Sequence, residues 1–199
     1  MVTARGCPLR CTYCALANNS LYPYRQRNVS SVLSEITEAV DSFGARFIDF
    51  EDENLSFDKK WFLALLKGII SRFGKKPPEL RAMNGLFPPT LDKETVCAMK
   101  EAGFKTLNLS LGSVCPSQLQ RFRRPDVRES FDISLVFAEE CSLDAVGYVI
   151  SGAPAQKASQ SLDDLLYLAG RRVLTGLSVF YPAPGSHDYD VCKSLGVLP

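Results

Sequence analysis

Several features are scarce in this chain of 199 residues. It has one tryptophan and one histidine, His187, and its net charge is only +1 at pH 7. One histidine cannot supply the His pair of a zinc site with two Cys and two His ligands. A nearly neutral chain has no strong electrostatic attraction for nucleic acid. The main apolar stretches, residues 61–70 and 145–150, are interrupted or short, whereas a bilayer span needs about 20 apolar residues. Composition therefore predicts neither a nucleic-acid-binding protein nor a membrane-spanning one.

Cysteine, in contrast, is present at seven positions, and three of them lie close together. Cys7, Cys11 and Cys14 follow the spacing C-x3-C-x2-C, and Gly6 and Pro8 favour a loop around them. Three thiolates on one metal centre leave a coordination position open, and a substrate or cofactor binds at such a position. The spacing therefore predicts a catalytic metal site rather than a structural one.

The remaining cysteines, Cys97, Cys115, Cys141 and Cys192, are isolated from one another in sequence. The first three fall in or beside predicted helices, where we expect them to be buried as small apolar side chains. Without a secretion signal or a paired pattern, no disulfide is expected. A zinc knuckle at the first three cysteines of the chain is the alternative to a catalytic centre, although no second Cys or His pair follows them.

The run Cys-Pro-Leu-Arg-Cys-Thr-Tyr-Cys at residues 7–14 resembles the cluster loop of radical SAM enzymes. The resemblance implies that Cys7, Cys11 and Cys14 hold a 4Fe–4S cluster, whose fourth iron is chelated by S-adenosylmethionine. It also implies that Tyr13 packs near the adenine and that a flavodoxin or ferredoxin donates electrons. Free thiols without a secretion signal predict that the protein is cytoplasmic. The pattern is most similar to cobalamin-associated subfamilies but lacks their cobalamin-binding domain, so cobalamin is expected only if a further domain exists.

Segments with helical and strand periodicity alternate along the chain, which predicts a parallel α/β protein. Predicted helices cover residues 29–43, 58–73, 91–102, 116–122, 130–141 and 162–168. Predicted strands cover residues 46–50, 80–83, 105–111, 145–151 and 177–181, after a stub at 1–4. The resemblance implies a partial (β/α)6 TIM-type barrel. Residues 1–199 are then a radical SAM core domain with a truncated first strand, either a fragment of a longer enzyme or a product that has lost its ends.

In parallel β/α folds the active site lies at the carboxyl ends of the strands. Asp52, Glu53 and Asn54 follow the strand predicted at 46–50. They form either a solvated acidic turn or acceptors for a bound ammonium group, and Asp52 and Glu53 are the favoured acceptors. In the family this loop often reads Gly-Gly-Glu and binds the methionine amino group, and cobalamin-associated subfamilies tend to show Asp-Asp-Asn, which these three residues resemble.

Residues 110–113 resemble a family segment, Ser-Leu-Glu-Ser, that approaches the cofactor ribose. Ser110 keeps its hydroxyl, whereas Gly112 replaces the glutamate, which predicts weaker cofactor binding or lower activity. Arg124 belongs either to a basic helix end, with Arg121 and Arg123, or to a pair with the cofactor carboxylate.

Residues 150–156 are similar to the family's Gly-x-Pro-Gly-Gln turn, whose strand and backbone flank the adenine. The resemblance therefore assigns Ile150 and Gly152 to the cofactor site, with Ala155 in place of the second glycine. Tyr181 begins a segment similar to Tyr-Pro-x-Pro-Gly-Thr and is assigned to the same site. His187 is either a base that contacts substrate or, as we expect, a surface loop residue.

The resemblance implies reductive cleavage of S-adenosylmethionine to a 5′-deoxyadenosyl radical, which abstracts hydrogen from an unknown substrate. Two other hypotheses stay open. One is a non-catalytic iron–sulfur or zinc protein, which the glycine at position 112 favours. The other is a degenerate scaffold that binds a partner and does not need the cysteine loop.

Overall fold

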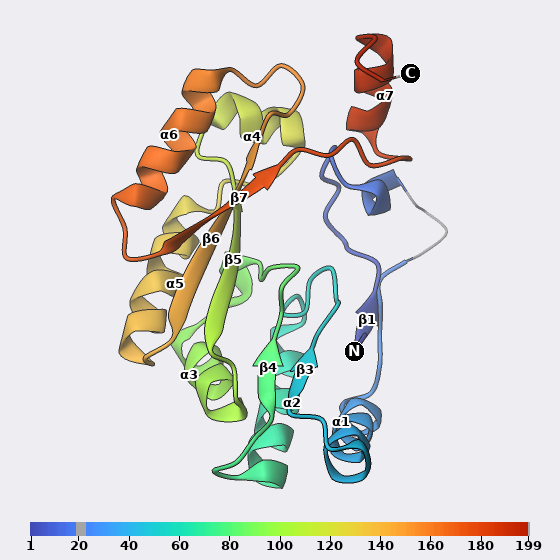
Figure 1. The fold of residues 1–199 in the computed structure, drawn as a ribbon, viewed down its shortest axis with the longest axis vertical. Helices are drawn as coiled ribbons and strands as arrows, with labels where there is room; N and C mark the ends of the chain where they lie inside the picture. The colour runs from blue at the N-terminus through green and yellow to red at the C-terminus, as the bar shows by residue number, and fades with distance from the viewer. Residues whose placement is uncertain (19–22, 199) are drawn as a thin grey trace.

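Parallel strands form the centre of the computed structural model, which describes residues 1–18 and 23–198 (Figure 1). Strands β3 (Phe47–Asp49) and β4 (Glu79–Arg81) pair in parallel. Strands β5 (Thr106–Gly112), β6 (Asp144–Ser151) and β7 (Leu174–Val179) form a second parallel sheet in that order. Parallel bridges at Leu80–Phe104 and Leu86–Leu109 link the two sheets. Parallel strands that do not close into a barrel, among the described residues, confirm the predicted fold class, a partial α/β barrel.

The start of the chain lies along the edge of β3. Met1 N donates a hydrogen bond to Asp49 O (2.6 Å), and Glu51 N donates to Met1 O (2.8 Å). The predicted stub at residues 1–4 thus adjoins β3. Immediately after it, β1 (Ala4–Arg5) pairs antiparallel with β2 (Arg25–Gln26), a strand that the sequence analysis did not predict.

The helices follow from capping and amphipathic patterns. Helix α1 (Val29–Phe43) has the predicted bounds and ends at Gly44 in the left-handed conformation. Helix α2 (Lys59–Phe73) begins after Asp58, whose carboxylate accepts a hydrogen bond from Trp61 N (3.0 Å). The others are α3 (Lys93–Ala102), α4 (Pro116–Phe122), α5 (Arg128–Glu140), α6 (Ala158–Ala169) and α7 (His187–Ser194), with single turns η1 (Ala15–Asn18) and η2 (Pro88–Thr90).

Two predictions at the carboxyl end of the chain were wrong in detail. Strand β7 lies at 174–179 instead of 177–181, because Leu174 pairs with Val146 on the neighbouring strand. Helix α7 was not predicted, although Ser186 caps it by accepting a hydrogen bond from Tyr189 N (3.1 Å). His187 is exposed as expected, but it starts this helix rather than lying in a loop.

Aromatic and aliphatic side chains fill the space between the sheets and the helices. The Phe104 ring lies 6.1 Å from that of Phe50 and 6.3 Å from that of Phe62, and all three are fully buried. Helices α5 and α6 pack so closely on β6 that a Cβ at Gly147 would lie within 2.8 Å of Phe131 and Leu168. Among the described residues, no helix is long and apolar enough to cross a membrane.

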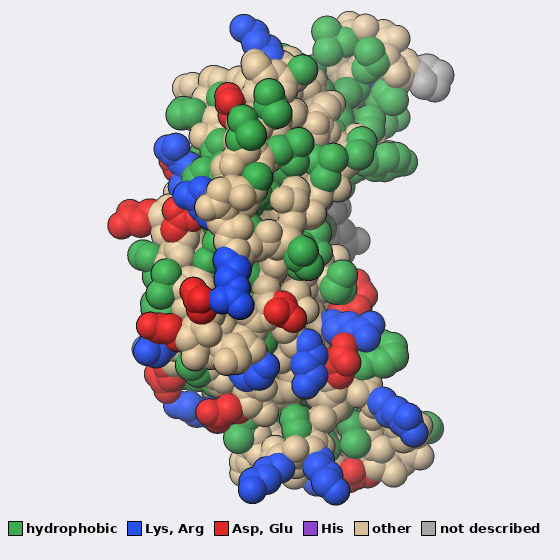
Figure 2. Space-filling view, turned by 60° about the vertical axis from the view of Figure 1, so that its left-hand side comes forward, with side chains coloured by type: hydrophobic (Ala, Val, Ile, Leu, Met, Phe, Trp, Pro, Cys, Tyr) green, Lys and Arg blue, Asp and Glu red, His purple; other side chains and the backbone are tan. Residues whose placement is uncertain are grey.

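The surface is divided by side-chain type along the long axis (Figure 2). Charged side chains of both signs cover the lower part of that view, and hydrophobic side chains gather toward the upper part, where Figure 1 places α6 and α7. Strand β7 has five exposed residues out of six and no strand on its outer edge among the described residues. The exposed apolar side chains of this region are Leu162, Leu166, Leu174, Leu177, Val179, Tyr181, Leu195 and Val197.

A disulfide joins Cys97 on α3 to Cys141, which follows α5, so the expectation of no disulfide was wrong. The Cα atoms are 5.1 Å apart although the residues are 44 positions apart in sequence. Contact between α3 and α5 brings them together, and sequence spacing gave no sign of that contact. Both cysteines are half-buried, and so is Cys115, rather than buried as predicted.

Loss of this disulfide is expected to lower the free energy of unfolding. A crosslink over a loop of this length restricts the unfolded chain and typically contributes about 2–4 kcal/mol. Cys97→Ser should therefore unfold at a lower denaturant concentration than the parent protein under oxidising conditions. Adding a reductant should remove the difference, and Cys115→Ser serves as a control thiol. An unchanged midpoint in Cys97→Ser would contradict this prediction.

Candidate active site

The three clustered cysteines lie on the loop between β1 and η1, next to the carboxyl ends of the strands (Figure 1). Cys11 is 5% exposed, and Cys7 and Cys14 are half-buried. Cys14 N donates a hydrogen bond to Cys11 O (3.1 Å), which closes a tight turn between them. None of the three is in a disulfide.

The cysteines share one electrostatic environment. Burial raises the pKa of Cys7, and Cys11, Cys14 and Glu53 raise it further by charge repulsion, partly offset by a backbone hydrogen bond at Leu9. Bringing three thiolates together without positive charge is therefore unfavourable, and iron would supply that charge.

Among the described residues, no three Cys, His, Asp or Glu side chains are gathered closely enough to hold a single metal ion. In a 4Fe–4S cluster each thiolate binds a different iron, so the sulfur atoms stand farther apart than around one ion. Three thiolate donors fit the chemistry of a 4Fe–4S cluster, and that they hold one stays a prediction.

Arg124 connects the cysteine loop to the end of β5. Its guanidinium donates hydrogen bonds to Tyr13 Oη (3.2 Å), Ser110 Oγ (3.0 Å) and Ser110 O (2.5 Å), and Nε donates to Leu111 O (3.3 Å). Arg124 is buried, and these contacts occupy much of its donor capacity. The structure thus places Arg124 as the residue that orients Tyr13, and its predicted contact with a cofactor carboxylate stays a prediction.

Tyr13 lies between Cys11 and Cys14 in the sequence, and its side chain packs against α4. Its ring packs edge-on against Phe122, with 4.9 Å between centroids. Burial raises the pKa of Tyr13 above its usual range, so the phenol is neutral at physiological pH. A neutral ring held by Arg124 and Phe122 provides a fixed, largely apolar surface on which a heterocycle can pack.

A cavity of about 390 Å³ opens beside this ring. It brings together five positions taken from separate parts of the sequence: Tyr13, Ser110, Gly112, Ile150 and Tyr181. Four of these were assigned to the cofactor site by resemblance, and Gly112 was noted there as a departure from the family. The volume lies within the range typical of small-ligand sites.

Other residues of this cavity were missed by the sequence analysis: Met83, Asn84, Gly85, Tyr148, Ser178, Val179 and Phe180. Tyr148 is fixed by donating a hydrogen bond to Asn108 Oδ1 (3.2 Å), and Asn84 Nδ2 donates to Glu51 Oε2 (3.4 Å). For Tyr148 the available signal was its position two residues before Ile150 on β6, because alternate residues of a strand face the same side.

The turn after β6 lies outside the set of residues that line the cavity. Gly152 has φ +83°, and Gln156 closes the turn by accepting a hydrogen bond from Ala153 N (3.1 Å) and donating one to Ile150 O (3.0 Å). Ala155, in place of the family's second glycine, also has a positive φ of 60°. The glycine-like backbone is therefore kept despite the substitution.

The acidic turn after β3 divides into residues with different surroundings. Asp52 is buried and accepts hydrogen bonds from Thr3 N, Thr3 Oγ1 (2.7 Å) and Ala4 N. Glu53 is exposed and lies close enough to Cys7 to affect its pKa. Asn54 is buried, and its Oδ1 has no hydrogen-bond partner among the described residues. The carboxylate of Asp52 is therefore occupied by hydrogen bonds within the chain. Glu53 and Asn54 have acceptor oxygens that remain for a ligand.

Asp52→Ala is expected to lower the free energy of unfolding by about 3 kcal/mol, because buried donors at Thr3 and Ala4 lose a charged acceptor. Glu53→Ala should change it by less than about 0.5 kcal/mol, as is usual for an exposed side chain. Glu53→Ala should instead weaken binding of S-adenosylmethionine, because the Glu53 carboxylate is the acceptor expected for its amino group. Denaturant unfolding and calorimetric titration of both variants measure the two effects, and equal stabilities would contradict the assignment.

A family model described as the Radical SAM superfamily matches residues 1–143. Among curated proteins, a bacteriochlorophyllide d C-12(1)-methyltransferase from Chlorobaculum tepidum is 23% identical over 97% of this chain and 42% of its own length. An anaerobic magnesium-protoporphyrin IX monomethyl ester cyclase from Cereibacter sphaeroides is 27% identical over 59% of this chain and 19% of its own. The chain thus spans less than half the length of these relatives.

Solved structures show the same fold. The radical S-adenosylmethionine methyltransferase TsrM from Kitasatospora setae, with cobalamin and a [4Fe-4S] cluster bound, matches with a TM-score of 0.82 and 18% identity. The match covers 100% of this chain and 40% of TsrM. OxsB, a cobalamin-dependent S-adenosylmethionine radical enzyme with aqua-cobalamin bound, matches with a TM-score of 0.67 and 15% identity, over 100% of this chain and 30% of its own.

Proposed function

This chain belongs to the radical SAM superfamily, and we propose that residues 1–199 form a core domain that binds a 4Fe–4S cluster and S-adenosylmethionine. When bound and reduced, the cluster supplies the electron that cleaves S-adenosylmethionine to methionine and a 5′-deoxyadenosyl radical, which takes hydrogen from a substrate. The observation that carries the proposal is the cavity beside Tyr13, because it joins the cysteine loop to Ser110, Ile150 and Tyr181.

Each group of residues has a separate part in this function. Cys7, Cys11 and Cys14 hold the cluster. Glu53 and Asn54 accept hydrogen bonds from the methionine amino group. The carboxylate of Asp52, in contrast, already accepts hydrogen bonds from Thr3 and Ala4, whereas Asn54 Oδ1 has no partner among the described residues. The remaining residues of the cofactor site, from four separate segments, are Tyr13, Ser110, Ile150, Gly152 and Tyr181.

Arg124 contributes by fixing the position of Tyr13, and its contact with the cofactor carboxylate stays a prediction. Its hydrogen bonds to Ser110 and Leu111 hold it against the end of β5. The adenine is then placed between a fixed phenol ring and the β6 segment at Ile150. A one-electron donor such as a flavodoxin or ferredoxin completes the system.

Methyl transfer is a second candidate function. Relatives named as methyltransferases align with nearly the whole chain, and TsrM carries cobalamin in its structure. A cobalamin-dependent reaction requires a cobalamin-binding region, which residues 1–199 are not proposed to supply. S-adenosylhomocysteine among the products would favour this function, and 5′-deoxyadenosine alone would favour hydrogen abstraction without methyl transfer.

The test is anaerobic reconstitution with iron and sulfide, followed by reduction with dithionite in the presence of S-adenosylmethionine. We expect a stoichiometry approaching a full cluster per chain and formation of 5′-deoxyadenosine. A cluster that forms without any cleavage of S-adenosylmethionine would favour a non-catalytic iron–sulfur protein. Failure to form a cluster would leave the scaffold hypothesis.

A further inference from the structure

Thr12 stands between Cys11 and Tyr13 and is 3% exposed. Its backbone N donates a hydrogen bond to Phe122 O (3.0 Å), at the end of α4. Its backbone O accepts one from Asp188 N (3.0 Å), in the first turn of α7. Its hydroxyl oxygen lies 3.2 Å from both Arg121 O and Asp188 Oδ2. Every polar group of Thr12 is thus engaged by two helices far away in the sequence.

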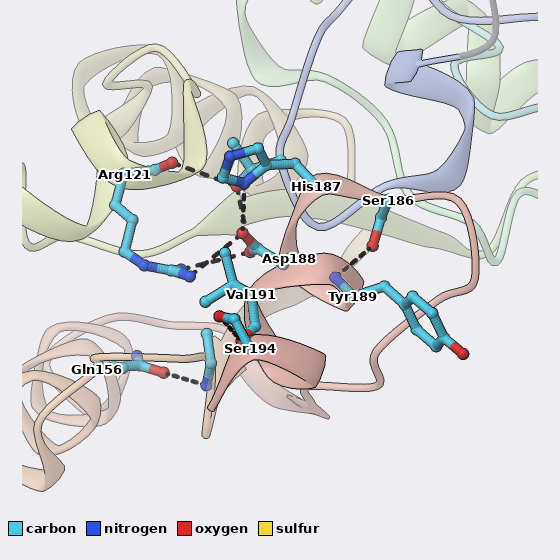
Figure 3. A network of polar contacts seen from close by, with 10 residues as sticks. Arg121, Gln156, Ser186, His187, Asp188, Tyr189, Val191 and Ser194 are labelled. Carbon is cyan, nitrogen blue, oxygen red and sulfur yellow. Dashed lines mark hydrogen bonds and ion pairs between the residues drawn. The ribbon is translucent and has the colours of Figure 1, made fainter. Parts of the chain in front are cut away.

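Asp188 is the centre of this network (Figure 3). The side chain is fully buried, and both carboxylate oxygens have partners. Arg121 Nη2 donates to Oδ1 (3.2 Å) and Arg121 Nη1 donates to Oδ2 (3.3 Å), while His187 Nδ1 lies 3.5 Å from Oδ1. A buried carboxylate is costly unless it is paired and hydrogen-bonded, so this one holds Arg121 and Thr12 in defined positions.

We propose that Asp188 and Arg121 are positioning residues for the cluster: they fix the cysteine loop through Thr12 and so set the placement of Cys11 and Cys14. The inference rests on the proposed function, because it needs the cysteines to be cluster ligands. Thr12 is bonded directly to Cys11, and the hydrogen bond from Cys14 N to Cys11 O makes the turn move with it. A shift of Thr12 therefore shifts two ligands at once.

Apart from these contacts of Thr12, the loop is held at Tyr13 by Arg124 and Phe122. It contains Gly6 and Pro8 and has no regular secondary structure from residue 6 until η1 begins at Ala15. Residues that orient metal ligands without binding the metal typically change metal affinity 10–100-fold when they are replaced. Asp188 acts in this manner from the opposite end of the chain, 176 positions from Thr12.

The experiment compares cluster retention in five reconstituted proteins: the parent, Asp188→Asn, Thr12→Val, the double variant of these two, and Asp190→Asn. Asp190 is on the same helix and exposed, so Asp190→Asn is the matched control. Thr12→Val leaves the ion pair between Asp188 and Arg121 in place and removes only the hydroxyl. The rate at which an iron chelator bleaches the cluster is measured anaerobically, together with the EPR spectrum of the reduced cluster before and after S-adenosylmethionine is added.

We expect Asp188→Asn to lose its cluster about 10-fold faster than the parent, and Thr12→Val to lose it faster in the same direction. The EPR spectrum of both variants should broaden or shift, which a general loss of stability in the apoprotein would not produce. The double variant should be close to the worse single variant, because both changes interrupt one connection.

Parent-like bleaching rates and EPR spectra in both variants would overturn the inference while leaving the proposed function intact. So would equal effects in Asp188→Asn and Asp190→Asn. If the parent itself forms no cluster, the proposed function fails and this inference fails with it. If Asp188→Asn does not fold, Thr12→Val decides by itself, since it keeps the buried ion pair.

Discussion

Cys11→Ala is expected to assemble no stable 4Fe–4S cluster and to form no 5′-deoxyadenosine. Cys11 is the buried member of the three cysteines, and its carbonyl closes the turn by accepting from Cys14 N. Alanine preserves the backbone turn and removes only the sulfur, so two ligands on the same loop remain. Two thiolates leave two irons without protein ligands, and such a cluster is exposed to loss of iron.

Iron and acid-labile sulfide per chain, and the yield of 5′-deoxyadenosine, measure this result. Cys115→Ala is the matched control, because Cys115 is a half-buried thiol outside the cysteine loop that contacts Ser117 and Gln160. It should keep the full cluster content. A Cys11→Ala protein that cleaves S-adenosylmethionine at the parent rate would contradict the assignment of the cluster to this loop.

Gly112→Glu, which would recreate the glutamate common in relatives, is expected to damage the site rather than improve it. Gly112 has φ +85°, and a Cβ there would lie 2.8 Å from Arg124 Nε and 2.9 Å from Arg124 Cδ. Any side chain at position 112 therefore strains the backbone and displaces Arg124. Because Arg124 holds Tyr13, the displacement extends to the cofactor cavity. The glycine is thus matched to the arginine in this chain.

A comparison of Gly112→Ala with Gly152→Ala separates the cost of backbone strain from the cost of displacing Arg124. Gly152 has φ +83°, but no atom lies within 4 Å of the Cβ that alanine would add. Gly152→Ala should cost about 1–2 kcal/mol of stability from backbone strain alone. Gly112→Ala should cost a further 1–3 kcal/mol, roughly, from overpacking against Arg124.

Denaturant unfolding measures both costs, and titration with S-adenosylmethionine should show weaker binding in Gly112→Ala. Equal stability of the two alanine variants would contradict the predicted clash between a side chain at position 112 and Arg124. Tighter binding of S-adenosylmethionine in Gly112→Glu would restore the interpretation that this chain lacks a carboxylate it needs.

Local sequence signals predicted most of the helices and strands. Asp58 and Gly74 mark the ends of α2 as capping residues, and the apolar spacing of residues 29–43 gives α1 its length. Such signals act within one or two turns, so they can be identified without knowing the fold. Helix α7 carried the same kind of signal in Ser186, but its short length and the preceding prolines masked it.

Local signals did not predict which side chains form hydrogen bonds with one another in the folded chain. Asp52 and Glu53 are adjacent acidic residues, yet one is used by Thr3 and Ala4 and the other faces solvent. Arg124 follows other arginines in sequence, yet it alone reaches Tyr13, 111 positions earlier. Contacts of this length depend on how the strands and helices are arranged, and no periodicity encodes them.

The sequence by itself determined the chemistry that this protein has available: three cysteines at a fixed spacing, an aromatic residue between them, and polar residues at the ends of parallel strands. These are properties of short segments, because ligand spacing and strand alternation are set by local backbone geometry. The tertiary structure decided which groups remain available to a cofactor. Asp52, Arg124 and Asp188 form hydrogen bonds within the chain, and Cys97 lies against Cys141. Buried charges and thiols pair with the groups that packing places next to them, and those neighbours are not encoded locally.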